Sequence, residues 1–242
     1  MTDITTKLIT YDANSISVIF PCYNEQDNIF RVYESASKVL KNMGIDYQII
    51  FVDDGSTDLT AQIANGIAVA DPRVMVIHHF ANLGYGSALQ SGFRAATKTL
   101  IFHSDSDGQF DINELPALIP LIKHYDIISG FRLNRQDNLV RKFNAWCWTT
   151  FVCFLFGLKL TDINCAFKLY RRSIFDRIKI RSTGAFINAE IFARANHCGF
   201  TITQVGVHHF PRTSGRPTGS KPRVIFRAFW ELAKLYKEIN SK

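Results

Sequence analysis

The chain has 242 residues, of which 47% are hydrophobic, 20% charged and 13% aromatic. These proportions are typical of a folded globular protein and exclude a disordered or collagen-like chain. The net charge of +7 is uneven: residues 1–130 carry 8 Lys and Arg against 15 Asp and Glu, and residues 131–242 carry 20 against 6. The second part therefore favours an anionic partner, and charge alone leaves open phosphate, nucleic acid or an anionic membrane surface.

The first part of the chain alternates short apolar runs with amphipathic stretches, the pattern of a parallel sheet with crossover helices. The apolar runs predict strands at 16–20, 48–52, 74–78, 99–103 and 126–129. The stretches between them predict helices at 27–43, 58–69, 86–97 and 112–124. These elements define an open, mostly parallel α/β sheet flanked by helices, and such sheets bind ligands at the carboxyl ends of their strands.

The second part is less regular and contains two aromatic, basic-flanked segments. Residues 143–158 carry no charge and are shorter than the roughly 20 residues that span a bilayer. Residues 223–239 mix aromatic and aliphatic residues with Arg and Lys. Both segments predict amphipathic helices at a membrane interface, and a buried core helix is the alternative for the first.

The cysteines and the first residues indicate where the protein resides. The five cysteines show no CxxC pair and no metal-ligand spacing, so reduced thiols are expected. The start of the chain lacks the continuous apolar segment of a signal peptide. Together these features predict a cytosolic protein.

Acidic residues follow two of the predicted strands: Asp53 and Asp54 the second, Asp105 and Asp107 the fourth. Crowded carboxylates repel each other unless a cation or hydrogen-bond donors compensate. Mg²⁺ and Mn²⁺ take carboxylate, amide and phosphate oxygens as ligands. Asp105 and Asp107, with the amide oxygen of Gln109, therefore predict a divalent-metal site shared with a nucleotide diphosphate, and Asp54 is a candidate nucleoside ligand.

Six segments of the chain resemble, in order and spacing, the family 2 glycosyltransferases of GT-A fold. They are SVIFPCYNEQDNI, IIFVDDGSTDLT, NLGYGSALQSGF, HSDSDGQFD, SGFR and DINCAFKLYRR, the last with Ala166 in place of the family's usual Gly. Within the family, the chain is most similar to dolichyl- and polyprenyl-phosphate mannose and glucose synthases. The resemblance covers nearly the whole chain. It implies a single GT-A domain over 1–242, with a nucleotide-sugar-binding part at 1–130 and an acceptor- and membrane-facing part at 131–242.

The resemblance also implies roles for individual residues. The donor-binding residues would be Pro21, Tyr23, Glu25, Val52, Asp54, Asp105, Ser106, Gln109, Arg212, Arg216 and Lys221. The catalytic residues would be Asp105, Asp107 and Arg132, with Asp107 and Gln109 at the metal. Arg132, Arg141 and Glu190 would face the acceptor, and a core or helix-capping role is an equal alternative for Glu190. Two registers fit the family's basic-loop pattern, one starting at Arg212 and one at Arg216, and the sequence does not choose between them.

The implied reaction is a single inverting displacement on a nucleotide sugar. A hexose would move from a GDP-mannose or UDP-glucose type donor to a polyprenyl or dolichyl phosphate, with Mg²⁺ or Mn²⁺, at the cytosolic face of a membrane. A phosphate oxygen is already anionic and needs no strong general base, whereas a saccharide hydroxyl needs one. A saccharide or protein acceptor is the alternative.

The expected partners follow from this reaction. They are the nucleotide-sugar donor, the polyprenyl phosphate, the membrane surface, and a membrane-anchoring subunit or a second copy of the chain. A basic nucleic-acid-binding module is a remote alternative, disfavoured because the acidic strand ends would repel a polyanion.

Overall fold

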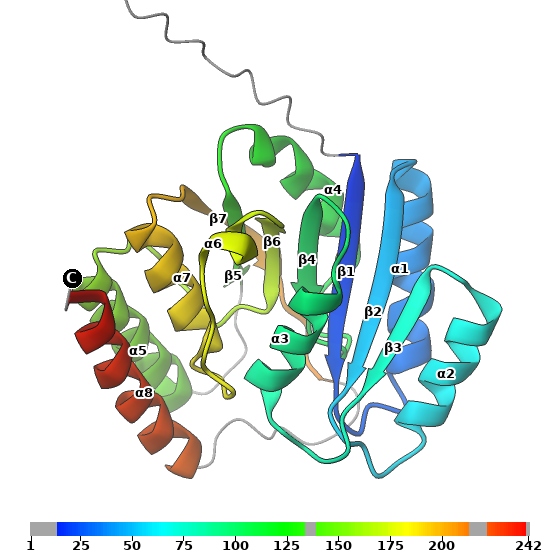
Figure 1. Cartoon of the computed structure of the whole chain (residues 1–242), viewed down its shortest axis with the longest axis horizontal. Helices are drawn as coiled ribbons and strands as arrows, with labels where there is room; N and C mark the ends of the chain where they lie inside the picture. Colours follow the sequence, from blue (N-terminus) through cyan, green and yellow to red (C-terminus); the bar gives the residue numbers. More distant parts are fainter. Residues whose placement is uncertain (1–13, 134–138, 213–221, 241–242) are drawn as a thin grey trace, which may run out of the picture.

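The computed structural model describes residues 14–133, 139–212 and 222–240, with the side chains of 139–141, 222–229 and 240 excepted. These residues form a seven-stranded sheet with helices on both faces (Figure 1). The strands are β1 (Ser15–Cys22), β2 (Asp46–Asp53), β3 (Val74–His78), β4 (Leu100–Ser104), β5 (Ile127–Leu133), β6 (Phe167–Arg171) and β7 (Ile202–His208). The helices are α1 (Ile29–Met43), α2 (Thr60–Ala70), α3 (Tyr85–Ala95), α4 (Leu115–Leu118), α5 (Leu139–Phe156), α6 (Ile174–Arg177), α7 (Ile187–His197) and α8 (Pro222–Asn240), with 3-10 turns η1 (Ile112–Glu114) and η2 (Ile119–Lys123) flanking α4.

The strand order is β3-β2-β1-β4-β6-β5-β7, and β6 is antiparallel to both of its neighbours. The remaining strands run in one direction, so their carboxyl ends share the lower edge of the sheet in Figure 1. Because β6 is reversed, the turn that precedes it lies at this edge too. We refer to it as the carboxyl edge.

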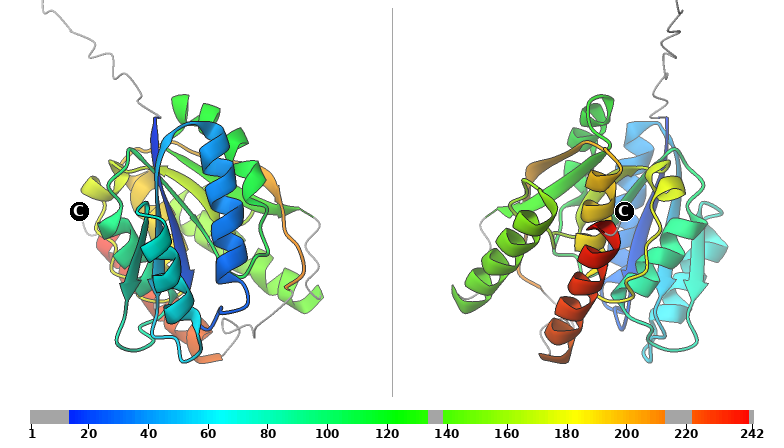
Figure 2. Two further views of the ribbon diagram at one scale, coloured as in Figure 1. Left: turned by 90° about the vertical axis from the view of Figure 1, so that its right-hand side faces the viewer. Right: turned by 60° about the vertical axis from the view of Figure 1, so that its left-hand side comes forward.

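The sheet separates two apolar layers. The turned views of Figure 2 show the helices that cover its two faces. One layer packs against α1, α2 and the α4 region, and the other against α3, α5, α7 and α8. Alternation along β1 illustrates the division, since Val18 and Phe20 belong to the first layer and Ile19 to the second. Burial on both faces explains why the strands read as continuous apolar runs in the sequence.

The five predicted strands and the first three predicted helices are confirmed. The prediction of one helix over 112–124 is wrong, because the segment folds as the short succession η1, α4 and η2. Pro116 and Pro120 lie within it. Pro120 has no N–H to donate to the carbonyl of Pro116, and its ring crowds the preceding turn, so a continuous α-helix is not formed.

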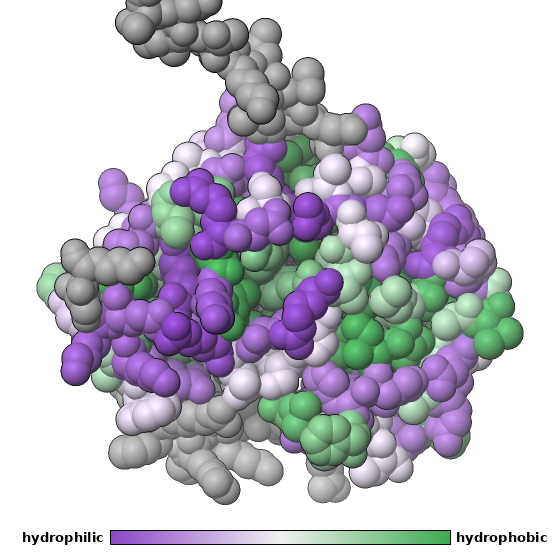
Figure 3. All heavy atoms as spheres, viewed as in Figure 1, coloured by the Kyte–Doolittle hydropathy of each residue, from purple (hydrophilic) through white to green (hydrophobic). Residues whose placement is uncertain are grey.

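The two predicted C-terminal helices correspond to α5, which ends at Phe156 rather than at 158, and to α8. Both lie at the end of the molecule remote from β3 (Figure 1), and the right-hand view of Figure 2 shows that they diverge from each other. The rings of Phe156 on α5 and Tyr236 on α8 are in contact, with centroids 6.2 Å apart. Within the described ranges, no helix is both long enough and apolar enough to cross a membrane. In Figure 3, hydrophilic residues cover most of the visible face, and a compact apolar patch lies toward the β3 end of the sheet.

Candidate active site

The loop after β4 carries the paired aspartates and is fixed at several points. The hydroxyl of Ser106 donates a 2.8 Å hydrogen bond to the carbonyl of Pro21, which ties the loop to the end of β1. The backbone N–H of Gln109 donates to Asp107 Oδ1 at 3.1 Å. Gly108 has φ +72°, and a Cβ there would lie 2.4 Å from Nη2 of Arg31. The positive φ therefore favours glycine at this position, and a methyl group there would also displace the end of the Arg31 side chain.

The negative charges of Asp105 and Asp107 in this loop repel each other. Burial, followed by the negative charge of Asp107, raises the pKa of Asp105 to about 7, against the lowering influence of Tyr85, Lys168 and Arg132. Like charges this close favour either a shared proton or a bound cation. The loop is thus suited to a divalent metal.

A guanidinium group from the far end of the chain joins this acidic site. Arg212 donates to Oδ2 of Asp107 at 3.3 Å and to Oε1 of Glu25. Asn28 donates to the other Glu25 oxygen at 2.7 Å, and burial is the main cause that raises the pKa of Glu25. Glu25, Asp107 and Arg212, separated widely in sequence, therefore meet at the carboxyl edge as predicted residues of one site.

Arg132, near the end of β5, is held by a carboxylate from the turn before β6. Its Nε and Nη2 donate to Oδ2 and Oδ1 of Asp162 at 2.7 and 3.1 Å. Both side chains are little exposed, at 12% and 11%. A bidentate pair of this kind fixes the guanidinium plane. Arg132 therefore projects from β5 in a defined orientation.

Lys168 of β6 is fully buried behind these groups. Its Nζ donates to the backbone carbonyl of Cys165 and, at 2.9 Å, to Oδ1 of Asn188 on α7. Burial lowers the pKa of Lys168 to about 8. The lysine thus belongs to a polar cluster beneath the acidic loop.

The aspartates at the end of β2, Asp53 and Asp54, are paired with the histidines at the end of β3. Asp54 accepts hydrogen bonds from the backbone N–H groups of Leu83 and Gly84, at 3.0 and 2.8 Å, and hydrogen-bonds to Nδ1 of His79 at 2.6 Å. Asp53 pairs in the same way with His78 at 3.0 Å. Asp54 therefore organises the turn that leads into α3, and its contact with a nucleoside stays a prediction.

The carboxylate of Glu190 is buried and accepts hydrogen bonds from other residues of the protein. Only 1% of the residue is exposed, and its carboxylate accepts from the backbone of Ser182 at 2.7 Å and from Nε of Arg194 at 2.7 Å. It also accepts from the backbone N–H of Arg181. These contacts favour the core role over the acceptor-facing one.

The remaining predicted residues are distributed as follows. Tyr23 is half-buried after β1. Val52 is fully buried in β2 between β1 and β3, and its contact with a nucleoside stays a prediction. The side-chain amide of Gln109 donates to the carbonyl of Phe210 at 2.9 Å. The side chain of Arg141, and Arg216 and Lys221 as a whole, lie outside the described residues.

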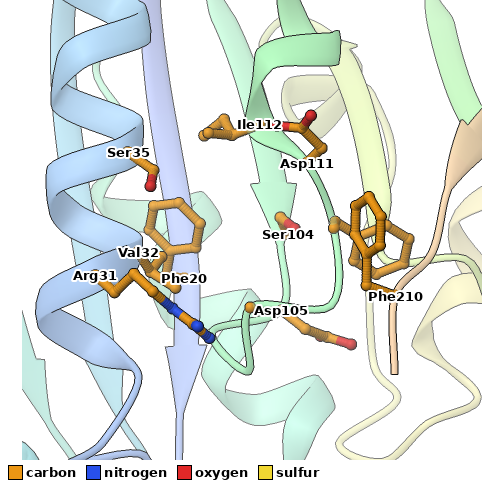
Figure 4. Close-up of a pocket in the computed structure, with 11 residues that line it drawn as sticks. Phe20, Arg31, Val32, Ser35, Ser104, Asp105, Asp111, Ile112 and Phe210 are labelled. Carbon is orange, nitrogen blue, oxygen red and sulfur yellow. The ribbon is translucent and has the colours of Figure 1, made fainter. Parts of the chain in front are cut away.

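A cavity of about 250 Å³ borders the acidic loop on its α1 side (Figure 4). Arg31 and Ser35 of α1 face it, opposite Phe210, and Asp105 and Asp111 lie along it. No sequence motif predicts that Arg31 or Tyr85 lies beside this loop. Both positions depend on how α1 and α3 pack on the sheet, which motif spacing does not encode.

The donor set fits a divalent cation that is shared with a ligand. Among the described residues, no group of three or more His, Cys, Asp and Glu could hold a metal alone. Mg²⁺ is commonly held by one or two carboxylates together with substrate phosphates. Asp107, with Asp105 and the Gln109 amide oxygen nearby, supplies hard oxygen ligands of that kind.

The sheet order and the acidic loop at its carboxyl edge match the GT-A fold. Glucosyl-3-phosphoglycerate synthase from Mycobacterium tuberculosis, solved with Mn²⁺, UDP-glucose and phosphoglyceric acid, superposes with a TM-score of 0.72 over 93% of this chain and 81% of that one, at 18% identity. Its UDP complex gives 0.68, with coverage of 95% and 81% at 19% identity. At these identities the likeness concerns the fold alone.

The sequence profile described as "Glycosyl transferase family 2" matches residues 17–179, and the chain belongs to that family. Similar curated proteins include undecaprenyl-phosphate 4-deoxy-4-formamido-L-arabinose transferases. That of Pseudomonas fluorescens is 31% identical over 90% of this chain, and that of Yersinia pestis is 32% identical over 87%. The chain spans 64% of the length of each of these relatives.

Proposed function

We propose that this protein transfers a sugar from a nucleoside-diphosphate donor to a polyprenyl phosphate in a reaction that depends on a divalent cation. The observation that carries the proposal is the meeting of Asp105 and Asp107 with the guanidinium groups of Arg132 and Arg212 at one edge of the sheet. The names of the curated relatives support a polyprenyl phosphate as acceptor.

On the donor side, Asp107 and Gln109 would hold Mg²⁺ or Mn²⁺, which would neutralise charge on the leaving diphosphate. Arg212 already contacts Asp107, and its positive charge would help to stabilise the same diphosphate. Pro21, Tyr23, Glu25, Val52 and Asp54 surround the ends of β1 and β2, where the nucleoside would lie. With the nucleoside and the diphosphate placed in this way, the sugar would lie between the acidic loop and Arg132.

On the acceptor side, Arg132 would bind the lipid phosphate. A phosphate monoester is predominantly dianionic at neutral pH, since its second pKa is about 6. Its oxygen would form a bond to the anomeric carbon while the bond to the diphosphate breaks, and the electron pair would leave with the nucleoside diphosphate. No proton has to be removed, so the contribution of the protein is positioning and charge stabilisation.

The transferred sugar could belong to either of two classes. The sequence favours a hexose from GDP-mannose or UDP-glucose, whereas the relatives are named for an arabinose derivative, a pentose. A donor panel must therefore include both sugar classes.

The outer face of α5 would rest on the membrane that contains the acceptor. Val152 and Phe156 pack into the core, while Phe143, Trp146 and Phe154 are 62%, 63% and 83% exposed. Trp230 on the neighbouring α8 is 64% exposed. Exposed aromatic residues on adjacent helices in a strongly basic part of the chain are typical of interfacial binding.

Nucleoside-diphosphate release tests the proposal directly. The protein is incubated with Mg²⁺ or Mn²⁺, a panel of nucleotide sugars and a short polyprenyl phosphate, and release is measured with and without the lipid. Release from one donor that requires the lipid supports the proposal. Release that requires a saccharide instead would assign the acceptor to that class and contradict the proposed one.

A further inference from the structure

The turn before β6 holds Arg132, and this turn is itself held by hydrogen bonds at several points. Asp162 fixes Arg132 and also accepts from the backbone N–H of Asn164 at 3.1 Å. The backbone carbonyl of Asp162 accepts from the amide of Gln204 on β7 at 2.9 Å. At the other end of the turn, the carbonyl of Cys165 accepts from Nζ of Lys168. The turn is therefore attached at both ends.

Lys168 is unusual because a fully buried lysine normally has a carboxylate partner. Its two hydrogen-bond acceptors are the neutral oxygens of Cys165 and Asn188. In the ranges that the structure describes, no carboxylate lies within ion-pair distance of its Nζ, although the negative charges of Asp105 and Asp162 act on it. The cost of burying the ammonium group is thus offset by fixed oxygens and by the acidic groups of the site.

The close packing of β5 against this turn leaves the turn little room to move. A Cβ on Gly130, two residues before Arg132, would lie 3.0 Å from Sγ of Cys165 and 3.2 Å from the carbonyl of Phe167. Gly130 is in register with Val205 of β7, so β5 is also fixed on its outer side. A displacement of the Cys165 carbonyl would therefore be transmitted to β5 and to Asp162 together.

We propose that Lys168 is a positioning residue for the reaction: its ammonium group, anchored on Asn188 of α7, fixes the 162–165 turn so that Asp162 holds Arg132 in the orientation that meets the acceptor phosphate. The inference rests on the proposed function through the role of Arg132. It assigns to a buried residue that touches no substrate a measurable effect on the transfer step.

The test replaces Lys168 by Met, which has similar volume and no charge. We expect kcat to fall by about 10- to 100-fold, as for other residues that orient a functional group, while the affinity for the nucleoside diphosphate changes by less than about threefold. The exposed Lys179 provides the control, because Lys179→Met removes the same charge from the surface.

A spectroscopic measurement separates positioning from a merely structural role. The Nε–H of Arg132 donates to Asp162, so its NMR resonance should be distinct and slow to exchange in the parent protein. The resonance is assigned with Arg132→Lys. We expect it to shift and to exchange faster in Lys168→Met, while the remaining Arg Nε–H resonances stay in place.

A second variant tests the inference if Lys168→Met fails to fold. Lys168→Met leaves the amide of Asn188 buried without its donor, whereas Lys168→Met with Asn188→Leu removes both partners and restores an apolar contact. If the double variant folds and has the low kcat and altered Arg132 resonance, the inference stands. Parent-like kcat in either folded variant would overturn it, as would failure of both variants to fold. A parent protein without transfer activity would refute the proposed function, and the Arg132 resonance would then decide the inference alone.

Discussion

At the scale of single residues, the site depends on charges that compensate one another across the carboxyl edge. Asp105 and Asp107 repel, and Arg212 bridges Asp107 to Glu25. Arg132 is balanced by Asp162. Removal of one member therefore changes the environment of the rest, and effects on function should exceed effects on stability.

Asp107→Asn should lower turnover by more than about 100-fold, because the proposed metal would lose a carboxylate ligand and Arg212 would lose one acceptor oxygen. Mn²⁺ binding, followed by electron paramagnetic resonance, should weaken in parallel, while the circular dichroism spectrum stays unchanged. The control is Asp111→Asn in the same loop, where the carboxylate accepts only from Asn113 in the contacts described. Near-parent Mn²⁺ affinity in Asp107→Asn would remove Asp107 from the metal site.

Gly108→Ala should destabilise the protein by about 1 to 2 kcal/mol, since φ of +72° costs an L-residue roughly that much and the new methyl group meets Arg31. Urea denaturation measures the change. Gly66, inside α2, is the matched control, because a methyl group added there would have open space around it, with nothing within 4 Å. Gly66→Ala should instead stabilise by about 0.5 to 1 kcal/mol. Equal effects of the two substitutions would contradict the close approach at Gly108.

At the scale of elements, the connections between helices and strands are fixed by short polar motifs. Asp71, between α2 and β3, accepts from the backbone and side chain of Arg73 and from the hydroxyl of Tyr33. The Arg73 side chain is the main cause that lowers the pKa of Asp71 to about 2. The ion pair lies within the loop between α2 and β3, and the hydrogen bond from Tyr33 links that loop to α1.

Asp71→Asn should cost about 1 kcal/mol at neutral pH, a value kept small because Arg73 is partly exposed. The folded pKa of Asp71 lies below its ordinary value of 3.8, so the stabilisation is complete above pH 3.8 and is lost as the pH falls toward 2. Unfolding free energies of parent and variant, compared from pH 7 down to pH 2, should therefore approach each other at the acid end. A difference that grows on acidification would contradict the sign of the shift.

The sequence predicts β1 to β5 and misses both the antiparallel β6 and the parallel β7. Strands such as β2 are buried on both faces and are apolar throughout, which makes them visible as runs. The β6 segment contains the buried Lys168 and a terminal Arg171, and neither fits a strand pattern. Its position between β4 and β5 comes from long-range pairing that local periodicity cannot show.

Some residues of the candidate site can likewise be predicted from the sequence, and others cannot. Spacing alone predicts the aspartates at strand ends, because parallel strands bring their carboxyl ends together. The Arg132 to Asp162 pair, the internal use of Glu190 and the position of Tyr85 require the tertiary packing. The family resemblance predicts Arg212 at the site, and the structure shows which carboxylates it contacts.

At the scale of the whole molecule, the acidic and the basic part of the chain contribute strands to one sheet, and the candidate site lies at its carboxyl edge. The exposed aromatic face of α5 lies in the basic part, at the end of the molecule remote from β3 (Figure 1). A surface of this composition would bring the site to a lipid-borne acceptor, as the proposed function requires.

Replacing Phe143, Trp146 and Phe154 together by Ser should lower binding to vesicles of phosphatidylcholine and phosphatidylglycerol by more than about tenfold, because each side chain loses about 1 kcal/mol of interfacial burial. Vesicle flotation measures the change, and the binding of donor nucleotide should be unaffected. Val69, 90% exposed on α2, offers the control Val69→Ser. Parent-like flotation of the triple variant would exclude this face as the membrane contact.

The central claim is that the nucleophile is a phosphate on a polyprenyl chain. The most direct measurement is mass spectrometry of the lipid product formed from the accepted donor with polyprenyl phosphate, beside a matched reaction with the corresponding polyprenol. The account predicts a glycosyl phosphate polyprenol in the first reaction and no glycosylated lipid in the second, since Arg132 would have no phosphate to bind and no base would activate the hydroxyl. Glycosylation of the polyprenol, or sugar transfer only to a saccharide, would contradict it.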